Sequence, residues 1–419
     1  MKTLTPISAA LLVAFSANAF ADNNNAILFQ VGENNMAVTD QSDPSIQNNL
    51  IVQAQIGTSN DSDASQTTGT NRSVTTHLQI GEMNTAESSQ QGNTALSILS
   101  INQLGQSNSA SVTQFANVVL SGTFVNQLGS MNEAFLSQFN EVVTSIGAIA
   151  QAGEMNVAES DQNRVTFSSA FINQVGMTNL ADLTQEVVTS SSAFINQVGM
   201  ENGAQIEQTD DVVESIGSIF QTGLMNAADF EQEDEVVASI GSITQVGQMN
   251  AAGLNQRGSV TGSSAFINQS GSMNVGAIDQ NGVFAGSALI NQVGSMNGAE
   301  VNQNLITASS ALVSQVGSMN DANINQESGT DLSVAIINQL GETNEADIVQ
   351  QDGTSLSFAN INQAGSMNAA DITQKGAALS IASTTQLGSD NMHTTTQTGV
   401  GQTAIVVQIG SGNMGMITQ

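Results

Sequence analysis

Apolar and polar residues alternate with a period of two over short stretches of the chain. In SSAFINQ (263–269) one set of alternate positions holds Ser, Ala, Ile and Gln, and NGAEVNQ (297–303) alternates in the same way. Strict alternation is typical of strands that bury one face. The strand segments are separated by G-x-x-N, where Gly tolerates backbone angles that other residues avoid and Asn can bond to nearby backbone. The pattern therefore predicts a unit of strand, tight corner, strand and looser corner.

This unit recurs along nearly the whole chain. The decapeptide SSAFINQVGM occurs at 168–177 and again at 191–200, and Q-x-G-x-x-N occurs 17 times from Gln30 to Gln408, at spacings of 22 to 25 residues. A second Gln follows eleven residues after the first in every copy. A two-strand unit cannot bury one face alone, whereas stacked copies can. We therefore expect an all-β fold, a parallel β-solenoid with two sheets and 17 strand-turn-strand rungs.

Stacking in register places like residues in columns. The position two before the first Gln holds Ile or Val in twelve consecutive copies, from Ile101 to Ile361. Inward Gln and Asn would each meet an identical amide about 4.8 Å away, so each can donate to one neighbour and accept from the other. A buried amide without partners is costly, and we therefore expect a stacked amide ladder. Its members in the regular copies include Gln103, Asn108, Gln114, Gln127, Asn132, Gln138, Gln174, Asn179, Gln185, Gln197, Asn202, Gln208, Gln292, Asn297 and Gln303.

The chain divides by regularity into four segments. Residues 1–21 combine a lysine, a short apolar run and small residues before a cleavage point, a pattern that predicts a secretory signal peptide. Irregular copies fill 22–96, regular copies fill 97–379, and two irregular copies fill 380–419. Atypical terminal copies are what solenoids use as caps.

The charge balance narrows the range of partners. Without Lys2, the chain has four basic residues against 36 acidic ones, a net charge of 4 − 36 = −32. Nucleic acid is therefore excluded as a partner, because a phosphate-binding face needs clustered Lys and Arg. No segment after the signal is apolar enough for membrane insertion. The absence of Cys excludes disulfides and thiolate metal sites.

A dense acidic patch lies in the middle of the chain. We expect its carboxylates to act as charge gatekeepers that slow unwanted association. Weak Ca²⁺ binding by these acids is a second expectation, although the repeat lacks the Gly-rich calcium-binding pattern. No unique insertion or recurring nucleophile is present, so we expect no enzyme activity, catalytic residue, cofactor or dedicated metal site. The gatekeepers are Asp210, Asp211, Glu214, Glu233, Asp234 and Glu235.

The repeat Ser-x5-Gln-x-Gly-x2-Asn-x-Ala-x3-Gln resembles the curlin repeat of the curli subunits, the functional amyloid of enterobacterial biofilm matrix. Thirteen of the 17 copies carry the leading Ser, and thirteen carry Ala two residues after the Asn. The resemblance implies a secreted subunit that assembles head to tail with itself into extracellular, pilus-like adhesion fibres on a Gram-negative cell. It also implies two partners, a nucleator subunit and an outer-membrane secretion channel. The alternatives are the nucleator itself, or a monomeric β-solenoid that acts as an adhesin or as a Ca²⁺- or lattice-binding surface protein.

Overall fold

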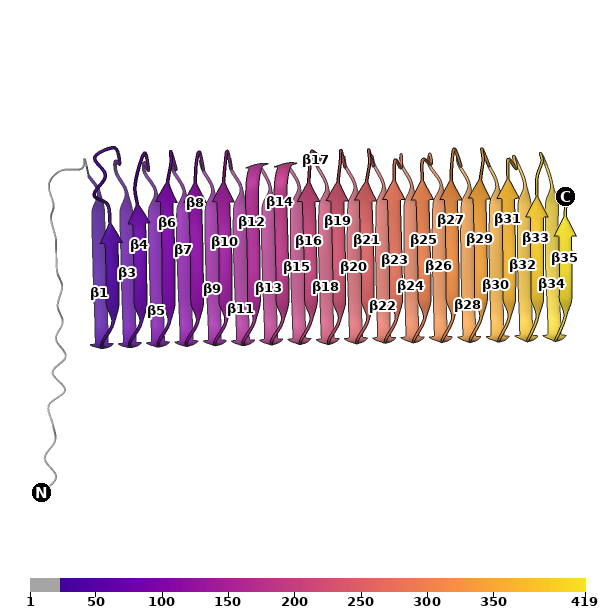
Figure 1. Cartoon of the computed structure of the whole chain (residues 1–419), viewed down its shortest axis with the longest axis horizontal. Helices are drawn as coiled ribbons and strands as arrows, with labels where there is room; N and C mark the ends of the chain where they lie inside the picture. The colour runs from indigo at the N-terminus through magenta and orange to yellow at the C-terminus, as the bar shows by residue number, and fades with distance from the viewer. Residues whose placement is uncertain (1–22) are drawn as a thin grey trace, which may run out of the picture. The chain divides into compact units, whose positions relative to one another are not determined.

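The structure is a computed structural model that describes residues 23–419. These residues form β-strands that are connected by short corners and turns (Figure 1). The predicted signal peptide, residues 1–21, lies outside this part of the chain. No helix long and apolar enough to cross a membrane occurs among residues 23–419. The chain forms two compact units, one ending at Ser190 and the other running from Ser191 to Gln419.

In the first unit, seven strands form sheet A and seven form sheet B. The strands of sheet A are β1 (Asn25–Glu33), β3 (Leu50–Thr58), β5 (Val74–Glu82), β7 (Ile98–Gln106), β9 (Gly122–Ser130), β11 (Ile146–Glu154) and β13 (Ser169–Met177). The strands of sheet B are β2 (Met36–Asp40), β4 (Asp61–Gln66), β6 (Thr85–Gln91), β8 (Ser109–Phe115), β10 (Glu133–Phe139), β12 (Val157–Thr166) and β14 (Leu180–Thr189).

The second unit repeats this arrangement with ten strands in sheet A. They are β15 (Ser192–Met200), β18 (Ile216–Leu224), β20 (Ile240–Gln248), β22 (Ser264–Ser272), β24 (Ser287–Ser295), β26 (Ser310–Ser318), β28 (Val334–Glu342), β30 (Phe358–Ser366), β32 (Ile381–Ser389) and β34 (Thr403–Ser411). Its sheet B contains β16 (Gly203–Thr209), the short β17 (Val212–Val213), β19 (Ala227–Glu233), β21 (Ala251–Arg257), β23 (Val275–Asn281), β25 (Gly298–Asn304), β27 (Asp321–Glu327), β29 (Glu345–Gln351), β31 (Ala369–Lys375), β33 (Met392–Gln397) and β35 (Met414–Thr418).

Within each unit, every strand except the short β17 pairs in parallel with the equivalent strand of a neighbouring copy. In sheet A, Gln127 of β9 lies opposite Gln151 of β11, with glycines opposite each other two residues later. In sheet B, Gln138 of β10 lies opposite Gln162 of β12. Like residues therefore stack on like residues, and the predicted all-β parallel β-solenoid with two sheets is confirmed.

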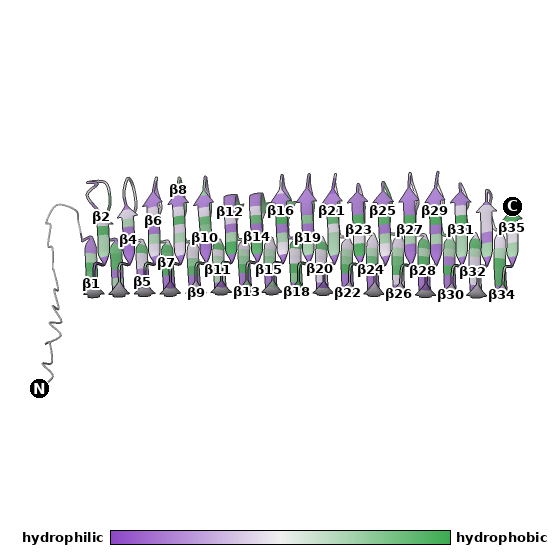
Figure 2. Cartoon of the chain, turned by 60° about the horizontal axis from the view of Figure 1, so that its bottom comes forward, coloured by the Kyte–Doolittle hydropathy of each residue, from purple (hydrophilic) through white to green (hydrophobic). Residues whose placement is uncertain are grey.

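The core lies between the two sheets of each unit. Burial alternates along the strands, as in β20 and β21, so that every second side chain is buried. The Ile and Val column is fully buried, with Ile149 and Ile243 at 0% exposure. Figure 2 shows the result as hydrophobic and hydrophilic bands that alternate along the strands. The alternation that predicted the strands is thus the alternation between the core and the outer face.

The tight corner after each sheet A strand requires glycine. Gly129 has a φ of 124°, outside the range that other residues adopt comfortably. A Cβ built there would lie 2.0 Å from the carbonyl oxygen of Gly153 in the next copy. Neighbouring copies approach so closely at this corner that no side chain fits. This explains why every copy has Gly two residues after its first Gln.

Deletion of one whole copy, residues 287–309, should leave the fold and its urea midpoint nearly unchanged. This segment contains β24 and β25, and Ser287 lies opposite Ser310, so its removal joins equivalent positions. Each rung contacts only its neighbours, and the stack simply closes up. Far-ultraviolet circular dichroism during urea unfolding is the measurement.

Deletion of residues 298–309 is the matched control. It removes β25 and the following corner, so that a sheet A strand would have to continue where a sheet B strand belongs. This mismatch should lower the urea midpoint strongly. Equal effects of the two deletions would show that the 23-residue rung is not the folding unit.

Candidate functional site

The first Gln of each copy forms a continuous hydrogen-bonded column inside each unit. Nε2 of Gln103 donates to Oε1 of Gln127 at 2.9 Å, and Nε2 of Gln127 donates to Oε1 of Gln151 at 2.9 Å. Both Gln103 and Gln127 are about 1–2% exposed. The carboxamides therefore satisfy one another along the column, in the core, away from water.

The same amide group also joins the two sheets. Nε2 of Gln103 donates to the carbonyl oxygen of Thr85 at 2.7 Å and to that of Asn108 at 3.1 Å. Thr85 begins β6 of sheet B in the preceding copy, and Asn108 precedes β8 in the same copy. One amide hydrogen of Gln103 is thus donated to the next Gln of the column, and the other is donated to backbone carbonyl oxygens at sheet B.

The second Gln of each copy forms a parallel column. Nε2 of Gln114 donates to Oε1 of Gln138 at 2.9 Å, and Nε2 of Gln208 donates to Oε1 of Gln232 at 2.7 Å. In several copies this amide also reaches a sheet A carbonyl, as Gln303 does to Ser287 at 3.1 Å. The two Gln columns therefore connect the sheets from opposite sides of the core.

The corner Asn forms a third column. Oδ1 of Asn108 accepts from the backbone N–H of Asn132 at 3.2 Å and from its Nδ2 at 3.0 Å. Nδ2 of Asn132 also donates to the carbonyl of Gly153 at 2.9 Å. The Asn side chain therefore fixes the corner to the copies on both sides.

The structure places all fifteen sequence-predicted ladder residues in these three columns, each at most 2% exposed. For the members near the boundary of the two units, partners within the same unit include Gln151 for Gln174, Gln162 for Gln185, and Gln221 for Gln197. Each of these amide pairs lies within 2.9 Å.

A fourth column, formed by the leading Ser of the repeat, was not assigned a role from the sequence. Oγ of Ser121 donates to the carbonyl of Val119 at 3.0 Å and accepts from the N–H of Ser145 at 3.2 Å. These bonds hold the looser corner, which also stacks through single bridges such as Val119 to Val143. The recurrence of Ser in thirteen copies was the signal that pointed to it.

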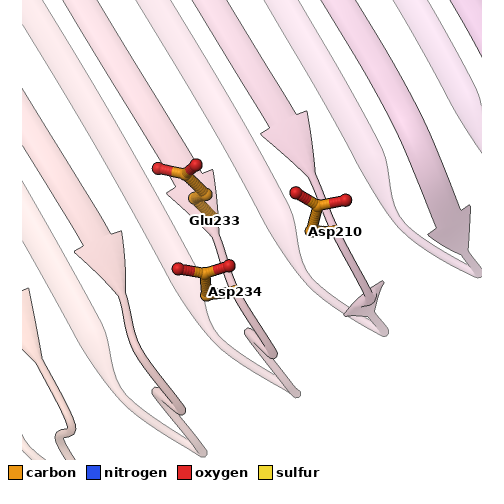
Figure 3. A group of neighbouring side chains, drawn as sticks. All are labelled: Asp210, Glu233 and Asp234. Carbon is orange, nitrogen blue, oxygen red and sulfur yellow. The ribbon is translucent and has the colours of Figure 1, made fainter.

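The charge gatekeepers occupy two successive looser corners of the second unit. The structure brings Asp210, Glu233 and Asp234 together, with carboxylate oxygens within 4.8 Å of one another (Figure 3). Asp211 and Glu235 lie beside them with exposed side chains, and Glu235 accepts a hydrogen bond from Ser259 at 2.8 Å.

Glu214, the sixth gatekeeper, is exposed later in the first of these corners and does not join the three-residue group. Carboxylate oxygens are the ligands that Ca²⁺ takes, but a calcium ion uses six to eight of them. Three side chains, of which Glu233 is half-buried and the other two are exposed, supply only part of that number, and weak Ca²⁺ binding stays a prediction.

Further acids lie on the outer face of sheet B. Asp347 of β29 is half-buried, and this burial raises its pKa to about 6, with smaller contributions from Asp371, Glu345 and Asp321. Burial likewise raises the pKa of Asp229. Asp347 and Asp229 therefore hold protons more tightly than isolated carboxyl groups do.

Three basic residues form ion pairs with acids of an adjacent copy, and all three pairs are exposed. Such exposed pairs contribute little to stability, and they leave most of the negative charge unpaired. The pairs are Arg164 with Glu186 at 3.3 Å, Arg257 with Asp279 at 2.7 Å, and Lys375 with Asp352 at 3.1 Å.

A buried serine–histidine pair was not anticipated from the sequence. Oγ of Ser62 lies 2.8 Å from Nδ1 of His77, and burial lowers the pKa of His77 to about 3. His77 occupies the place of the Ile and Val column, and Ser62 replaces the usual Ala after the corner. Both side chains are at most 2% exposed, so no substrate reaches them, and the pair fills the core.

No protein-family model matches the chain, and no curated protein matches it. The similarity to the curlin repeat therefore rests on the repeat residues themselves.

Replacement of Gln245 by Glu should lower the stability of the second unit by about 3 kcal/mol, the size expected when a buried charge loses its partners. Gln245 accepts from Gln221 at 2.9 Å and donates to Gln269 at 2.9 Å. A carboxylate of the same shape accepts but cannot donate. Urea unfolding at pH 7 is the measurement.

Gln248→Glu provides the matched control, because Gln248 lies three residues later on β20 with an exposed side chain. It adds the same charge and should change the urea midpoint little. Acidic pH should partly restore Gln245→Glu, since a protonated carboxyl can donate again. Equal destabilisation by both substitutions would contradict a role for the ladder in stability.

The fold should become more stable as the pH falls from about 6 towards 4. Asp347 has an ordinary pKa of 3.8 when unfolded and a pKa of about 6 in the folded chain. The folded state therefore binds the proton more readily, so stability is lowest above pH 6 and rises on acidification. Urea midpoints measured between pH 7 and pH 4 test this.

Asp347→Asn should raise the midpoint at pH 7 and flatten its pH dependence. Asp211→Asn, in an exposed corner, removes the same charge and is the control. If the two variants follow the same pH dependence, the burial of Asp347 does not contribute to it.

Proposed function

We propose that the chain is a secreted structural subunit that polymerises end to end into curli-like amyloid fibres of the cell surface and biofilm matrix. The observation that carries the proposal is that the first and last rungs are open and complementary. The strands β1 and β2 form one end, and β34 and β35 form the other. An unpaired strand edge is a template for pairing with another chain.

In the described part of the chain, the column formed by the first Gln of each copy lacks a hydrogen-bond donor at its first member and lacks an acceptor at its last member. Nε2 of Gln30 donates to Gln55 at 2.6 Å, whereas no group among residues 23–419 donates to its Oε1. Gln408 accepts from Gln386 at 2.8 Å and donates to the carbonyl of Met392 at 3.0 Å, which leaves one amide hydrogen for a following rung. Gln30 of a second copy would continue the column by accepting that hydrogen.

Apolar core positions are also incompletely covered in the last rung. Val406 and Ile417 are half-buried, whereas the equivalent Ile361 and Ile372 in β30 and β31 are at most 1% exposed. A second copy placed on this end would cover them, which is favourable in proportion to the apolar area removed from water. A head-to-tail contact of this kind does not close on itself, and it produces a filament.

The partners implied by the curlin resemblance complete the proposal. A nucleator subunit would present the first complementary end, and an outer-membrane channel of a Gram-negative cell would export the chain. The acids, including the gatekeepers, would keep newly exported chains apart, because like charges about 5 Å apart lie within the Debye length of about 8 Å.

The purified chain from residue 22 to 419 should form fibres whose diffraction has a spacing of about 4.8 Å along the fibre axis. A compact folded domain fused directly to Gln419 should block the reaction by covering one end. The same domain attached through a long flexible linker should permit it. Electron microscopy and fibre diffraction are the measurements, and a chain that remains monomeric for weeks at high concentration would contradict the proposal.

The lag before fibres appear should shorten as salt is added, because salt screens the acids. A variant with all six gatekeepers changed to the corresponding amides should show the shorter lag already at low salt. Equal lags for parent and variant at every salt concentration would mean that these acids do not slow assembly.

A further inference from the structure

The outer face of sheet A is uncharged except at the end of some strands, where Glu33, Glu82, Glu154 and Glu342 are exposed. Four outward positions per strand precede this end, from five residues before the first Gln to one residue after it. Across the 17 sheet A strands in residues 25–411 these are 4 × 17 = 68 positions, and none holds Asp, Glu, Lys or Arg. In a chain with 36 acidic residues, this face stands apart from the rest of the surface.

The face is also apolar and ridged. The residue after the first Gln is Leu or Val in most copies and is exposed, as for Leu104 at 48%, Val246 at 47% and Leu340 at 57%. A shallow groove runs beside this ridge in each unit. In the first unit it has a volume of about 420 Å³ and is lined by Leu104, Leu128 and the neighbouring Asn102 and Asn126.

The second unit has an equivalent groove of about 220 Å³ between its own Asn and Leu columns, with Asn338 and Leu340 in its lining. In each unit the groove is adjacent to the ridge of that unit. A two-fold contact uses the same patch on both copies, so a ridge beside a groove offers both of the shapes that such a contact needs.

We propose that the outer face of sheet A is a pairing surface for a second copy of this chain, so that two solenoids associate laterally with their sheet B faces outward. The choice of occupant follows from charge. The outer face of sheet B carries acids such as Asp229, Glu231 and Asp347, so contact between two such faces would oppose carboxylates. Sheet A offers no cation to pair with these acids, so contact of sheet A with sheet B would bury them unpaired. Contact of sheet A with sheet A through the four outward columns that precede the strand ends buries no charge.

The available area is sufficient for a stable contact. In the second unit, ten strands about 4.8 Å apart and seven residues about 3.3 Å long present a face of roughly 1,100 Å². A specific interface of standard size buries about 800 Å² on each partner. This lateral pairing does not depend on the proposed end-to-end assembly, because it uses a different surface.

The decisive experiment separates the two kinds of association. The chain with a folded domain fused directly to Gln419 cannot extend end to end, and by analytical ultracentrifugation it should sediment as a dimer. Val246→Asp with Val293→Asp, two exposed positions on the sheet A ridge, should weaken this dimer at least about 100-fold, because like charges would be buried together.

Ala277→Asp with Asn323→Asp is the matched control. Both residues are exposed on the outer face of sheet B, and the pair adds the same two charges. The control should dimerise like the parent. Dimers that both double variants weaken equally would overturn the proposal, and so would a monomeric end-blocked parent at its highest soluble concentration.

Single cysteines give an independent readout, because the natural sequence has none. Val246→Cys should react with a maleimide more slowly as the concentration of the end-blocked chain rises, whereas Ala277→Cys should react at a constant rate. Equal protection of both positions would contradict pairing through sheet A.

In electron micrographs of the unblocked chain, paired filaments that become single filaments in the sheet A variant would support lateral pairing. Single filaments in the parent would overturn it while leaving end-to-end assembly intact, and lateral dimers without filaments would contradict only the proposed function.

Discussion

The rest of the structure depends on the buried carboxamide of the first Gln. Its oxygen needs a donor and its two amide hydrogens need acceptors, and each group left unpaired in the core costs about 1–3 kcal/mol. The column supplies one acceptor and the donor, and carbonyls of the opposite sheet, such as that of Thr85 for Gln103, accept the second hydrogen. These requirements are met only when copies stack in parallel and in register at a fixed sheet separation. A slip of one residue would turn every Gln outward, so this amide fixes the period, the pairing and the spacing of the sheets together.

The fold followed from the sequence because it is nearly one-dimensional. Alternation predicted the strands, and the repeat period predicted that Gln103 stacks on Gln127, since equivalent residues in neighbouring copies must be neighbours in space. Contacts between the sheets could not be predicted, because they depend on how far apart the sheets lie and how their strands are staggered. The bond from Gln103 to Thr85 and the contact of Ser62 with His77 are both of this kind.

The charges are distributed so that the core and the four outward columns of sheet A carry none of the acids. The carboxylates lie on the outer face of sheet B and in the corners, where a column of acids about 4.8 Å apart is repulsive. The partial burial that raises the pKa of Asp347 lowers stability at neutral pH, and the neighbouring acids add to this effect. Stability gained from the core and the amide columns offsets that repulsion within each unit. Contacts between chains lack the covalent connection, so there the same repulsion selects which surfaces can meet.

The hydrogen bonds and apolar contacts that stabilise the fold between rungs also favour association of chains at the end rungs. An inner rung contacts a neighbour on each side, whereas an end rung contacts one and leaves polar and apolar groups uncovered, as at Gln408 and Val406. The cost of two open ends is constant, so each added copy of the repeat makes it a smaller part of the total. Covering an end with another chain removes that cost altogether. The amide column that stabilises the solenoid is therefore incomplete at each end. The hydrogen bond between two Gln side chains that would complete it is the same bond that joins neighbouring copies within the chain.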